Sequence, residues 1–300
     1  MNIASTHRTV RWLFVARVVV KAAVLFVVLN ALFATCNPLD RFGSFSLYNR
    51  VLPGRERLPY GENAADSNNL TLSNLPAMLA SHAIAGSDGD EFRIVVIGDS
   101  ATWGWLQRPG ETLAARIQAH VAPIAGRDSV KVYNLGYPGM SLLKDLVILD
   151  RAMEYRPDLV VWAFTLESFP RDRQVEPSLV YENPDAVRDV AVRLGLDIDT
   201  TDPRFVEREG LDRTVVGSRR QLADLLRLQL YGVSWAATGS DIDIPDRYTP
   251  RQTDLPPDDT WRGLKPGTNL DDSRLAFDVL EAGTRLAGDV PVLFVNEPIY

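Results

Sequence analysis

Three short motifs follow apolar runs and carry the residues best suited to chemistry. The first is Gly98 to Gly104 (GDSATWG), which comes directly after the apolar run 93–97. Gly98 allows a sharp turn between a strand and a helix, so Ser100 is expected at the start of that helix with its hydroxyl facing solvent. A serine hydroxyl needs a base before it acts as a nucleophile. Taken alone, this motif predicts a nucleophilic serine or a plain helix cap equally well.

Two further motifs follow the next two apolar runs. Asn134 to Gly139 (NLGYPG) offers the backbone N–H of its last glycine to a substrate oxygen, although an ordinary turn explains this motif better when it is taken alone. Thr165 to Ser168 (TLES) follows the third run. Ligands of parallel α/β sheets bind outside the carboxyl ends of the strands. We therefore expect the three motifs to share one site.

The order of apolar runs and helical segments predicts an α/β domain over residues 91–300. The β-branched runs suit strands that are buried on both faces of a parallel sheet. These runs are residues 93–97, 130–134, 159–164 and 290–295. Helical periodicity is present at residues 111–122, 142–155 and 272–287. Alternating strands and helices imply right-handed crossovers and a doubly wound, mostly parallel sheet.

Two segments interrupt this alternation. Residues 37–90 are rich in Pro, Gly, Asn and Ser, which predicts a linker and lead-in with one helix near 73–84. Residues from about 170 to 271 predict a helical insertion, with helices at 184–195 and 218–236. Within it, residues 225–237 are apolar with few charges. A buried helix is the preferred interpretation of 225–237, and a helix on the membrane surface is the alternative.

Residues 1–36 are predicted to form an N-terminal signal anchor, that is, a transmembrane helix. They contain four basic residues (Arg8, Arg11, Arg17 and Lys21) and no acidic residue, and Ala22 to Cys36 are uncharged. The absence of an Ala-x-Ala site favours a retained anchor over a cleaved signal peptide, and a buried core helix is a further alternative. The positive flank predicts a single-pass membrane protein with a cytoplasmic N-terminus and an extracytoplasmic domain.

Composition excludes several classes of function. The formal net charge is −7, and with +4 in residues 1–36 the remainder carries −7 − 4 = −11, which argues against nucleic-acid binding. One cysteine, Cys36, leaves lipidation or a plain interfacial position as its alternatives and excludes an internal disulfide or zinc cluster. Gly98 to Gly104 lacks the spacing of a nucleotide-binding loop. We expect no metal and no cofactor.

Together the motifs resemble the SGNH (GDSL-type) hydrolase superfamily. Its first block, G-D-S-x-T-x-G, matches residues 98–104, and its second, N-x-G-x-x-G, matches residues 134–139. Pro157-Asp-Leu-Val-Val resembles the lead-in to its third block. The resemblance covers about 93–168, with a weaker continuation over 272–300. It implies an SGNH/flavodoxin-like sheet.

The resemblance also implies roles for individual residues. Ser100 is the nucleophile on an ester carbonyl, and the N–H groups of Ser100 and Gly139 hold the oxyanion. Asp99, Asn134 and Trp103 are placed with the substrate, although packing against the sheet is the simpler interpretation of Trp103. The expected activity is that of an extracytoplasmic serine esterase or O-acyltransferase, acting through an acyl-enzyme. Its substrate is expected to be an acyl ester of a cell-envelope glycan or lipid.

Two positions depart from the family pattern. The third block's asparagine position falls on Glu167, so Thr165 is the alternative donor to the oxyanion. The family's base lies in a late Asp-x-x-His, but no histidine follows His120, which we expect on a helix surface. We therefore expect the Asp-x-x-His segment beyond residue 300. The alternative function is a non-catalytic accessory or binding protein of the same fold that assists a membrane acyltransferase.

Overall fold

The computed structural model describes residues 3–61, 67–86, 89–239, 241, 267–270 and 274–297. The chain divides into two compact units. The first comprises Met1–Phe42 and Arg208–Ala223, and the second comprises Gly43–Glu207 and Asp224–Tyr300. Each is described by itself.

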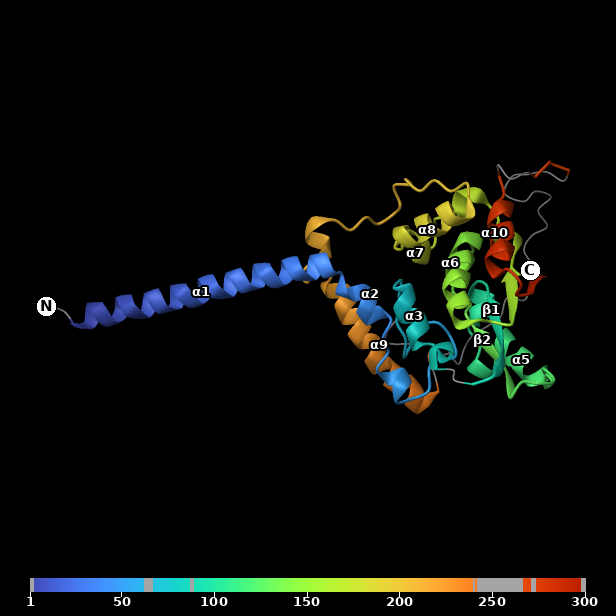
Figure 1. The fold of residues 1–300 in the computed structure, drawn as a ribbon, viewed down its shortest axis with the longest axis horizontal. Coiled ribbons are helices and arrows are strands. Elements are labelled where there is room, and N and C mark those ends of the chain that lie inside the picture. The colour runs from blue at the N-terminus through green and yellow to red at the C-terminus, as the bar shows by residue number, and fades with distance from the viewer. Residues whose placement is uncertain are drawn as a thin grey trace. The chain divides into compact units, whose positions relative to one another are not determined.

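The first unit is built on α1 (Ile3–Cys36), the long helix in Figure 1. Its segment Trp12–Cys36 has 25 residues and a mean hydropathy of 2.4, which is long and apolar enough to cross a membrane. A signal sequence near the N-terminus has the same length and composition. The 3₁₀ turn η7 (Gly210–Arg213) packs against α1 within this unit.

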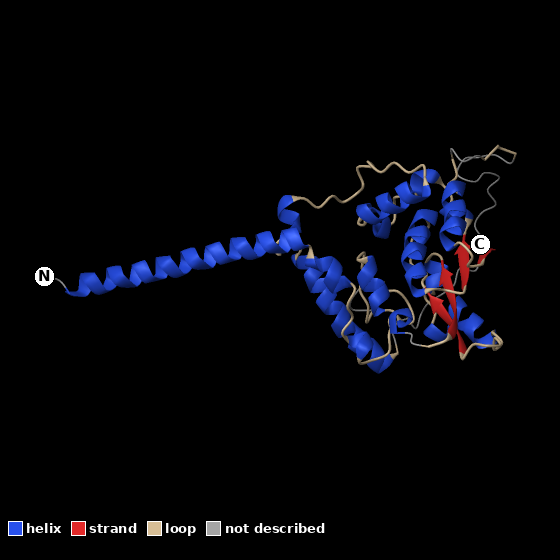
Figure 2. Ribbon diagram, in the orientation of Figure 1, coloured by secondary structure: helices blue, strands red, loops and turns tan. Residues whose placement is uncertain are grey.

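The second unit contains a parallel sheet of four strands (Figure 2). The strands are β1 (Glu91–Ile97), β2 (Ser129–Asn134), β3 (Leu159–Phe164) and β4 (Val292–Asn296). Their order is β2-β1-β3-β4, and every neighbouring pair is parallel. The registers pair Val96 with Asn134 and with Val161, so the carboxyl ends of β1, β2 and β3 lie at one edge. This confirms an α/β fold with a mostly parallel sheet.

Helices cover both faces of the sheet because side chains alternate along each strand. In β1, Ile94 and Val96 pack in a small cluster with Ala114 of α5 (Leu113–His120). Val95 and Ile97 belong to the large core cluster on the opposite face. The helices α6 (Leu142–Ala152) and α10 (Phe277–Ala287) contribute to that cluster and pack against each other.

The segments flanking the alternating region also enter the core. Leu58, Leu72 and Met78 are buried in the large cluster, the last of them in α3 (Leu75–Ser81). The described part of the predicted linker from Gly43 onward therefore belongs to the second unit and supplies part of its core. In the region predicted as an insertion, α7 (Ser178–Tyr181) and α8 (Pro184–Leu194) pack against α6. Residues 240, 242–266 and 271 of the predicted insertion lie outside the described residues.

The last long helix, α9 (Arg219–Thr238), runs beside α3 in Figure 1. Its residues Leu228, Gly232 and Trp235 face the protein and are buried. The aromatic ring of Tyr48 lies against Gly232, where an added Cβ would meet ring carbons at 2.4 and 2.5 Å. The hydroxyl of Tyr48 donates a hydrogen bond to Ser81 O at the end of α3. One tyrosine thus joins the two helices.

Candidate functional site

The strand order predicts a ligand-binding position at the carboxyl end of β1. The chain leaves β1 for β2 on one side and returns across to β3 on the other. In open α/β sheets this reversal of direction is where loops diverge and ligands bind. The three motifs that follow β1, β2 and β3 all begin at this edge. The fold therefore brings together the three motifs identified in the sequence.

Ser100 begins the one-turn helix α4 (Ser100–Trp103), directly after the turn at Gly98 and Asp99. Gly98 fits only because it has no side chain: an added Cβ would lie 2.3 Å from Thr102 Oγ1 and 2.8 Å from Ala163 O. The cap of α4 is Asp99, whose Oδ1 accepts from Ala101 N at 2.8 Å. The alternative that Ser100 is a helix cap is therefore wrong. Ser100 is half-buried, and its hydroxyl has no hydrogen-bond partner within the described part of the chain.

Hydrogen bonds join the loop after β1 to the loop after β2. Tyr137 N donates to Gly98 O at 2.9 Å, and Asn134 Nδ2 donates to Thr102 O at 2.9 Å. The side-chain oxygen of Asn134 accepts from Gly136 N at 3.0 Å, which closes its own loop. Asn134 is buried and its amide serves the protein, so its observed role is to hold the two loops together.

A buried lysine of α6, Lys144, binds the backbone of both loops. Lys144 Nζ donates to Gly98 O at 2.8 Å and to Tyr137 O at 2.5 Å. It also forms an ion pair with Asp145 Oδ1 at 2.8 Å, and both side chains are almost wholly buried. A buried charge is tolerated only when it is paired and hydrogen-bonded. Lys144 therefore fixes the backbone two residues before Ser100 and two residues before Gly139.

Gly139 lies two residues after Tyr137 in the second loop. Its φ of +115° is in the region that favours glycine, and an added Cβ would lie 3.1 Å from Pro177 Cβ and 3.9 Å from Lys144 Cδ. In the described part of the chain its backbone N–H makes no hydrogen bond. An unengaged N–H in a fixed loop is what an oxyanion hole requires.

Two carboxyl groups lie next to these loops, the buried Asp145 and the half-buried Glu297. Asp145 accepts from Trp162 Nε1 at 3.2 Å, and burial raises the pKa of its carboxyl to about 6 despite the neighbouring Lys144. Glu297 follows β4 and accepts from Thr102 Oγ1 at 3.1 Å. Burial, and then the negative charge of Asp99, raises the pKa of Glu297. The carboxyl groups of Asp145 and Glu297 therefore stay protonated to a higher pH than solvated carboxyl groups do.

Glu297 was not predicted from the sequence. Like Asp99 after β1, it is a carboxylate that follows the carboxyl end of an apolar strand. That recurrence is the signal that could have identified it. Its backbone N–H donates to Phe164 O at 2.8 Å, which continues the pairing of β3 with β4 up to the site.

The third motif contains Glu167 and Thr165, the two residues considered for the third oxyanion-hole position, and their contacts differ. Glu167 Oε2 lies 2.7 Å from Arg173 Nη1, so its negative charge is compensated locally. Thr165 comes directly after β3, and its buried hydroxyl has no hydrogen-bond partner in the described part of the chain. Of the two, Thr165 is the donor that remains available at the sheet edge.

The position of Trp103 contradicts the expectation that this residue contacts the substrate. Its side chain is 0% exposed, and its Nε1 donates to Leu58 O at 2.8 Å, so it packs in the protein and has no surface for a substrate. Tyr60 packs edge-on against it. Trp105, at 38% exposed, is the tryptophan next to the motif that solvent reaches. Asp99 is also buried and uses Oδ1 to cap α4.

Neither histidine of the second unit is a base for Ser100. His82 is fully buried: its Nδ1 accepts from Ile84 N and its Nε2 donates to Glu56 O. Burial lowers the pKa of its imidazole to about 4, so it stays neutral. His120 is exposed at the end of α5, where Nδ1 lies 2.8 Å from Arg116 O, as predicted for a surface histidine.

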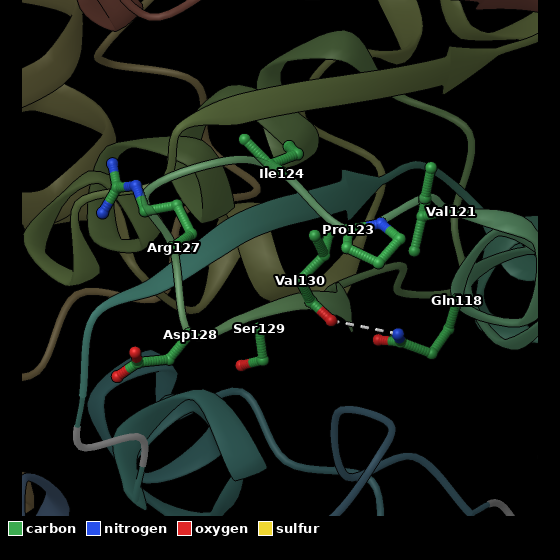
Figure 3. A pocket seen from close by; sticks show the side chains of 9 residues that line it. Gln118, Val121, Pro123, Ile124, Arg127, Asp128, Ser129 and Val130 are labelled. Atoms are coloured by element: carbon green, nitrogen blue, oxygen red, sulfur yellow. Dashed lines mark hydrogen bonds between the residues drawn. The ribbon is translucent and has the colours of Figure 1, made fainter.

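A shallow hollow of about 160 Å³ lies at the opposite end of β2 (Figure 3). Ser129 and Val130, which begin β2, form one wall, and Gln118 of α5 forms another. Gln118 Nε2 donates to Val130 O at 3.0 Å. Figure 3 shows the Ile124 and Pro123 side chains beside it, and none of the three motifs lines it. The hollow is thus separate from the candidate site.

Among the described residues, no group of three His, Cys, Asp or Glu side chains is placed to hold a metal ion. Comparison of the chain with protein-family models, with curated proteins and with solved structures finds no match. The geometry of the sheet edge therefore carries the functional inference.

Proposed function

We propose that this chain is a membrane-anchored, extracytoplasmic serine esterase or O-acyltransferase of SGNH type, with Ser100 as its nucleophile. Its substrate class is an acyl ester of a cell-envelope glycan or lipid. The doubly wound, SGNH-like arrangement of the sheet is part of this proposal. The observation that carries it is the pairing of two loops at the carboxyl edge: Tyr137 N donates to Gly98 O, which sets the Ser100 turn against the Gly139 loop.

The proposed reaction has two steps. In the first, a base removes the proton from Ser100 Oγ as this oxygen bonds to the acyl carbon; the ester bond then breaks and the base passes the proton to the leaving alcohol. In the second, water or an acceptor hydroxyl attacks the acyl-serine and restores the Ser100 hydroxyl. The N–H groups of Ser100 and Gly139, with the hydroxyl of Thr165, are the proposed donors to the oxyanion.

The anchor supports the cell-envelope part of the proposal. The span Trp12–Cys36 is apolar, and all four basic residues of the N-terminal segment precede Ala22. Basic flanks remain on the cytoplasmic side, which would place the second unit outside. An ester of a glycan or lipid at the envelope is the acyl donor or acceptor within reach of such a domain.

Turnover tests this proposal. We expect the full chain in detergent micelles to release alcohol from an activated acetyl ester, and Ser100→Ala to reduce the rate to background, because the acyl-enzyme cannot form. Ser234→Ala is the matched control, since Ser234 is an exposed serine of α9, and it should retain the wild-type rate. Equal rates for wild type and Ser100→Ala would exclude Ser100 as the nucleophile.

A second candidate is a non-catalytic binding protein that assists a membrane acyltransferase. The ion pair of Glu167 with Arg173 favours it, because the position that supplies an asparagine donor in the family here supplies a compensated carboxylate. The engaged ring nitrogens of His82 favour it as well. This candidate expects no turnover from wild type or Ser100→Ala. It expects wild type to bind an acylated glycan as tightly as Ser100→Ala does.

A further inference from the structure

The exposed face of α9 is apolar although the helix is already packed on its other side. Leu226, Leu230 and Val233 are 69%, 68% and 52% exposed. With Ala237 they follow the spacing i, i+4, i+7 and i+11, which places them on one stripe of the helix. The buried residues Leu228, Gly232 and Trp235 lie on the opposite side. The helix thus has two apolar faces, and the unit covers one of them.

The buried face fixes α9 to the part of the chain that follows α1. Gln229 Oε1 accepts from Leu47 N at 2.8 Å, within the second unit. Leu47 is eleven residues after the end of the apolar span at Cys36 (47 − 36). Eleven residues reach at most about 40 Å even when fully extended, and α2 (Pro38–Gly43) shortens that reach. The covalent chain therefore limits the distance between Cys36 and Leu47, the residue that Gln229 of α9 binds, to at most about 40 Å.

The N-terminal side of α9 supplies a second connection. Residues 208–223, which include the start of α9, belong to the same unit as α1, and η7 packs against α1. Near the C-terminal end of α1, Asn30 is buried, whereas Trp12 and Phe14 at the other end of the span are exposed. Large apolar side chains just before α9 are also exposed, namely Leu211, Val215 and Val216. A second group of exposed apolar side chains therefore precedes the exposed face of α9 along the chain.

The charge of α9 indicates which kind of surface its exposed apolar face binds. Helix α9 contains three arginines, Arg219, Arg220 and Arg227, and one acid, Asp224, so its net charge is 3 − 1 = +2. The chain after residue 36 carries −11, so α9 is a basic element in an acidic domain. All three arginines are exposed. Leucines with flanking arginines are the composition of helices that lie in the interface of a bilayer with anionic lipids.

We infer that α9 lies on the membrane surface, with Leu226, Leu230 and Val233 inserted at the level of the acyl chains and the arginines at anionic headgroups. The helix acts as a second membrane contact beside α1 and restricts the orientation of the second unit. The inference does not depend on catalysis by Ser100.

Quenching by lipid tests this inference on the full chain. In a Cys36→Ser background, Leu230→Cys is labelled with an environment-sensitive nitrobenzoxadiazole probe and reconstituted in phosphatidylcholine–phosphatidylglycerol vesicles with brominated acyl chains. Val192→Cys is the matched control, because Val192 is an apolar residue of α8 that is 82% exposed. We expect brominated lipid to quench the probe at position 230 several-fold more than the probe at position 192.

Two further arms make the outcome decisive. Replacing Arg219, Arg220 and Arg227 with Gln, or omitting phosphatidylglycerol, should lower quenching at position 230, because the electrostatic attraction is lost. Equal quenching at 230 and 192 would overturn the inference. A probe at position 230 that brominated lipid does not quench would also overturn the inference if a pyrene label at the same position forms excimers. Excimers would show that this face contacts a second copy of the chain.

Discussion

The helices α6 and α9 depart from the usual distribution of residues in opposite directions. Helix α6 buries a lysine and an aspartate, Lys144 and Asp145, at 0% and 1% exposure. Helix α9 leaves Leu226, Leu230 and Val233 exposed. Buried charge and a row of exposed large apolar side chains are the informative exceptions to the rule that apolar residues lie inside. Both therefore call for a cause outside ordinary packing.

The causes differ. Lys144 is held by three oxygen atoms from Gly98, Tyr137 and Asp145, so its burial serves the backbone around the candidate site. The leucines of α9 have no comparable set of partners among the described residues of the second unit, and the basic residues beside them match a lipid surface. One helix is thus adapted to the site inside the unit, and the other is adapted to a surface outside it.

The largest effect is expected from breaking the buried ion pair. Asp145→Ala leaves the Lys144 ammonium buried without its counter-charge, which should lower the free energy of unfolding by about 3–5 kcal/mol. Urea denaturation in micelles, followed by tryptophan fluorescence, measures this loss. Asp150→Ala on the same helix is the matched control, because the Asp150–Arg193 pair lies at the surface and should contribute less than about 1 kcal/mol. Equal losses from the two variants would show that burial of the pair is unimportant.

A smaller, pH-dependent effect is expected from buried His82. Its pKa is about 4 in the folded protein, against an ordinary value of 6.5 for a solvated imidazole, so the unfolded chain binds more protons between these values. The stability that neutral His82 contributes is complete above pH 6.5 and falls by about 3 kcal/mol as the pH falls to 4. The raised pKa of Asp145 acts with opposite sign in the same range, so the difference between variant and wild type is the quantity to measure.

The variants His82→Gln and His120→Gln isolate this contribution. Because glutamine does not titrate, His82→Gln should lose less stability than wild type between pH 6.5 and 4. His120 is exposed, so His120→Gln should follow the wild-type curve. Urea midpoints across this pH range supply the measurement. A His82→Gln curve parallel to wild type would contradict the neutral, buried state.

The smallest effect is expected on the exposed face of α9. Leu230→Ser should change the free energy of unfolding in micelles by less than about 0.5 kcal/mol, because the side chain is 68% exposed. Leu228→Ala, two residues earlier on the buried face, should cost about 2–5 kcal/mol. Chemical denaturation of both variants makes the comparison. A large loss from Leu230→Ser would mean that this face is covered within the protein.

Sequence periodicity predicted most elements of the sheet unit. The runs 93–97, 130–134 and 159–164 became β1, β2 and β3 with shifts of no more than two residues at an end. Helix α6 begins at Leu142 as predicted, and its cap is Ser141, whose Oγ accepts from Lys144 N at 3.1 Å. These elements were predictable because local apolar spacing and caps determine them.

Features that depend on distant contacts were not predictable. Helical periodicity over residues 142–155 does not indicate that Lys144 is buried, yet its ammonium group binds carbonyl groups of two loops inside the protein. Arg57 is likewise buried by Asp241, far along the chain, and by Gly104 O. Residues 225–237 contain one buried and one exposed apolar face, and their composition alone cannot separate these. At the site, the motif residues were found, but Glu297 and Lys144 were missed.

The most direct test of the central claim is covalent labelling of Ser100. The full chain in micelles is treated with a serine-reactive fluorophosphonate, digested and analysed by mass spectrometry. We predict a phosphonylated peptide containing Ser100, no label in Ser100→Ala, and full label in the control Ser234→Ala. An unlabelled wild-type protein beside a labelled reference hydrolase would contradict the claim, and the chain would then be better described as a binding protein.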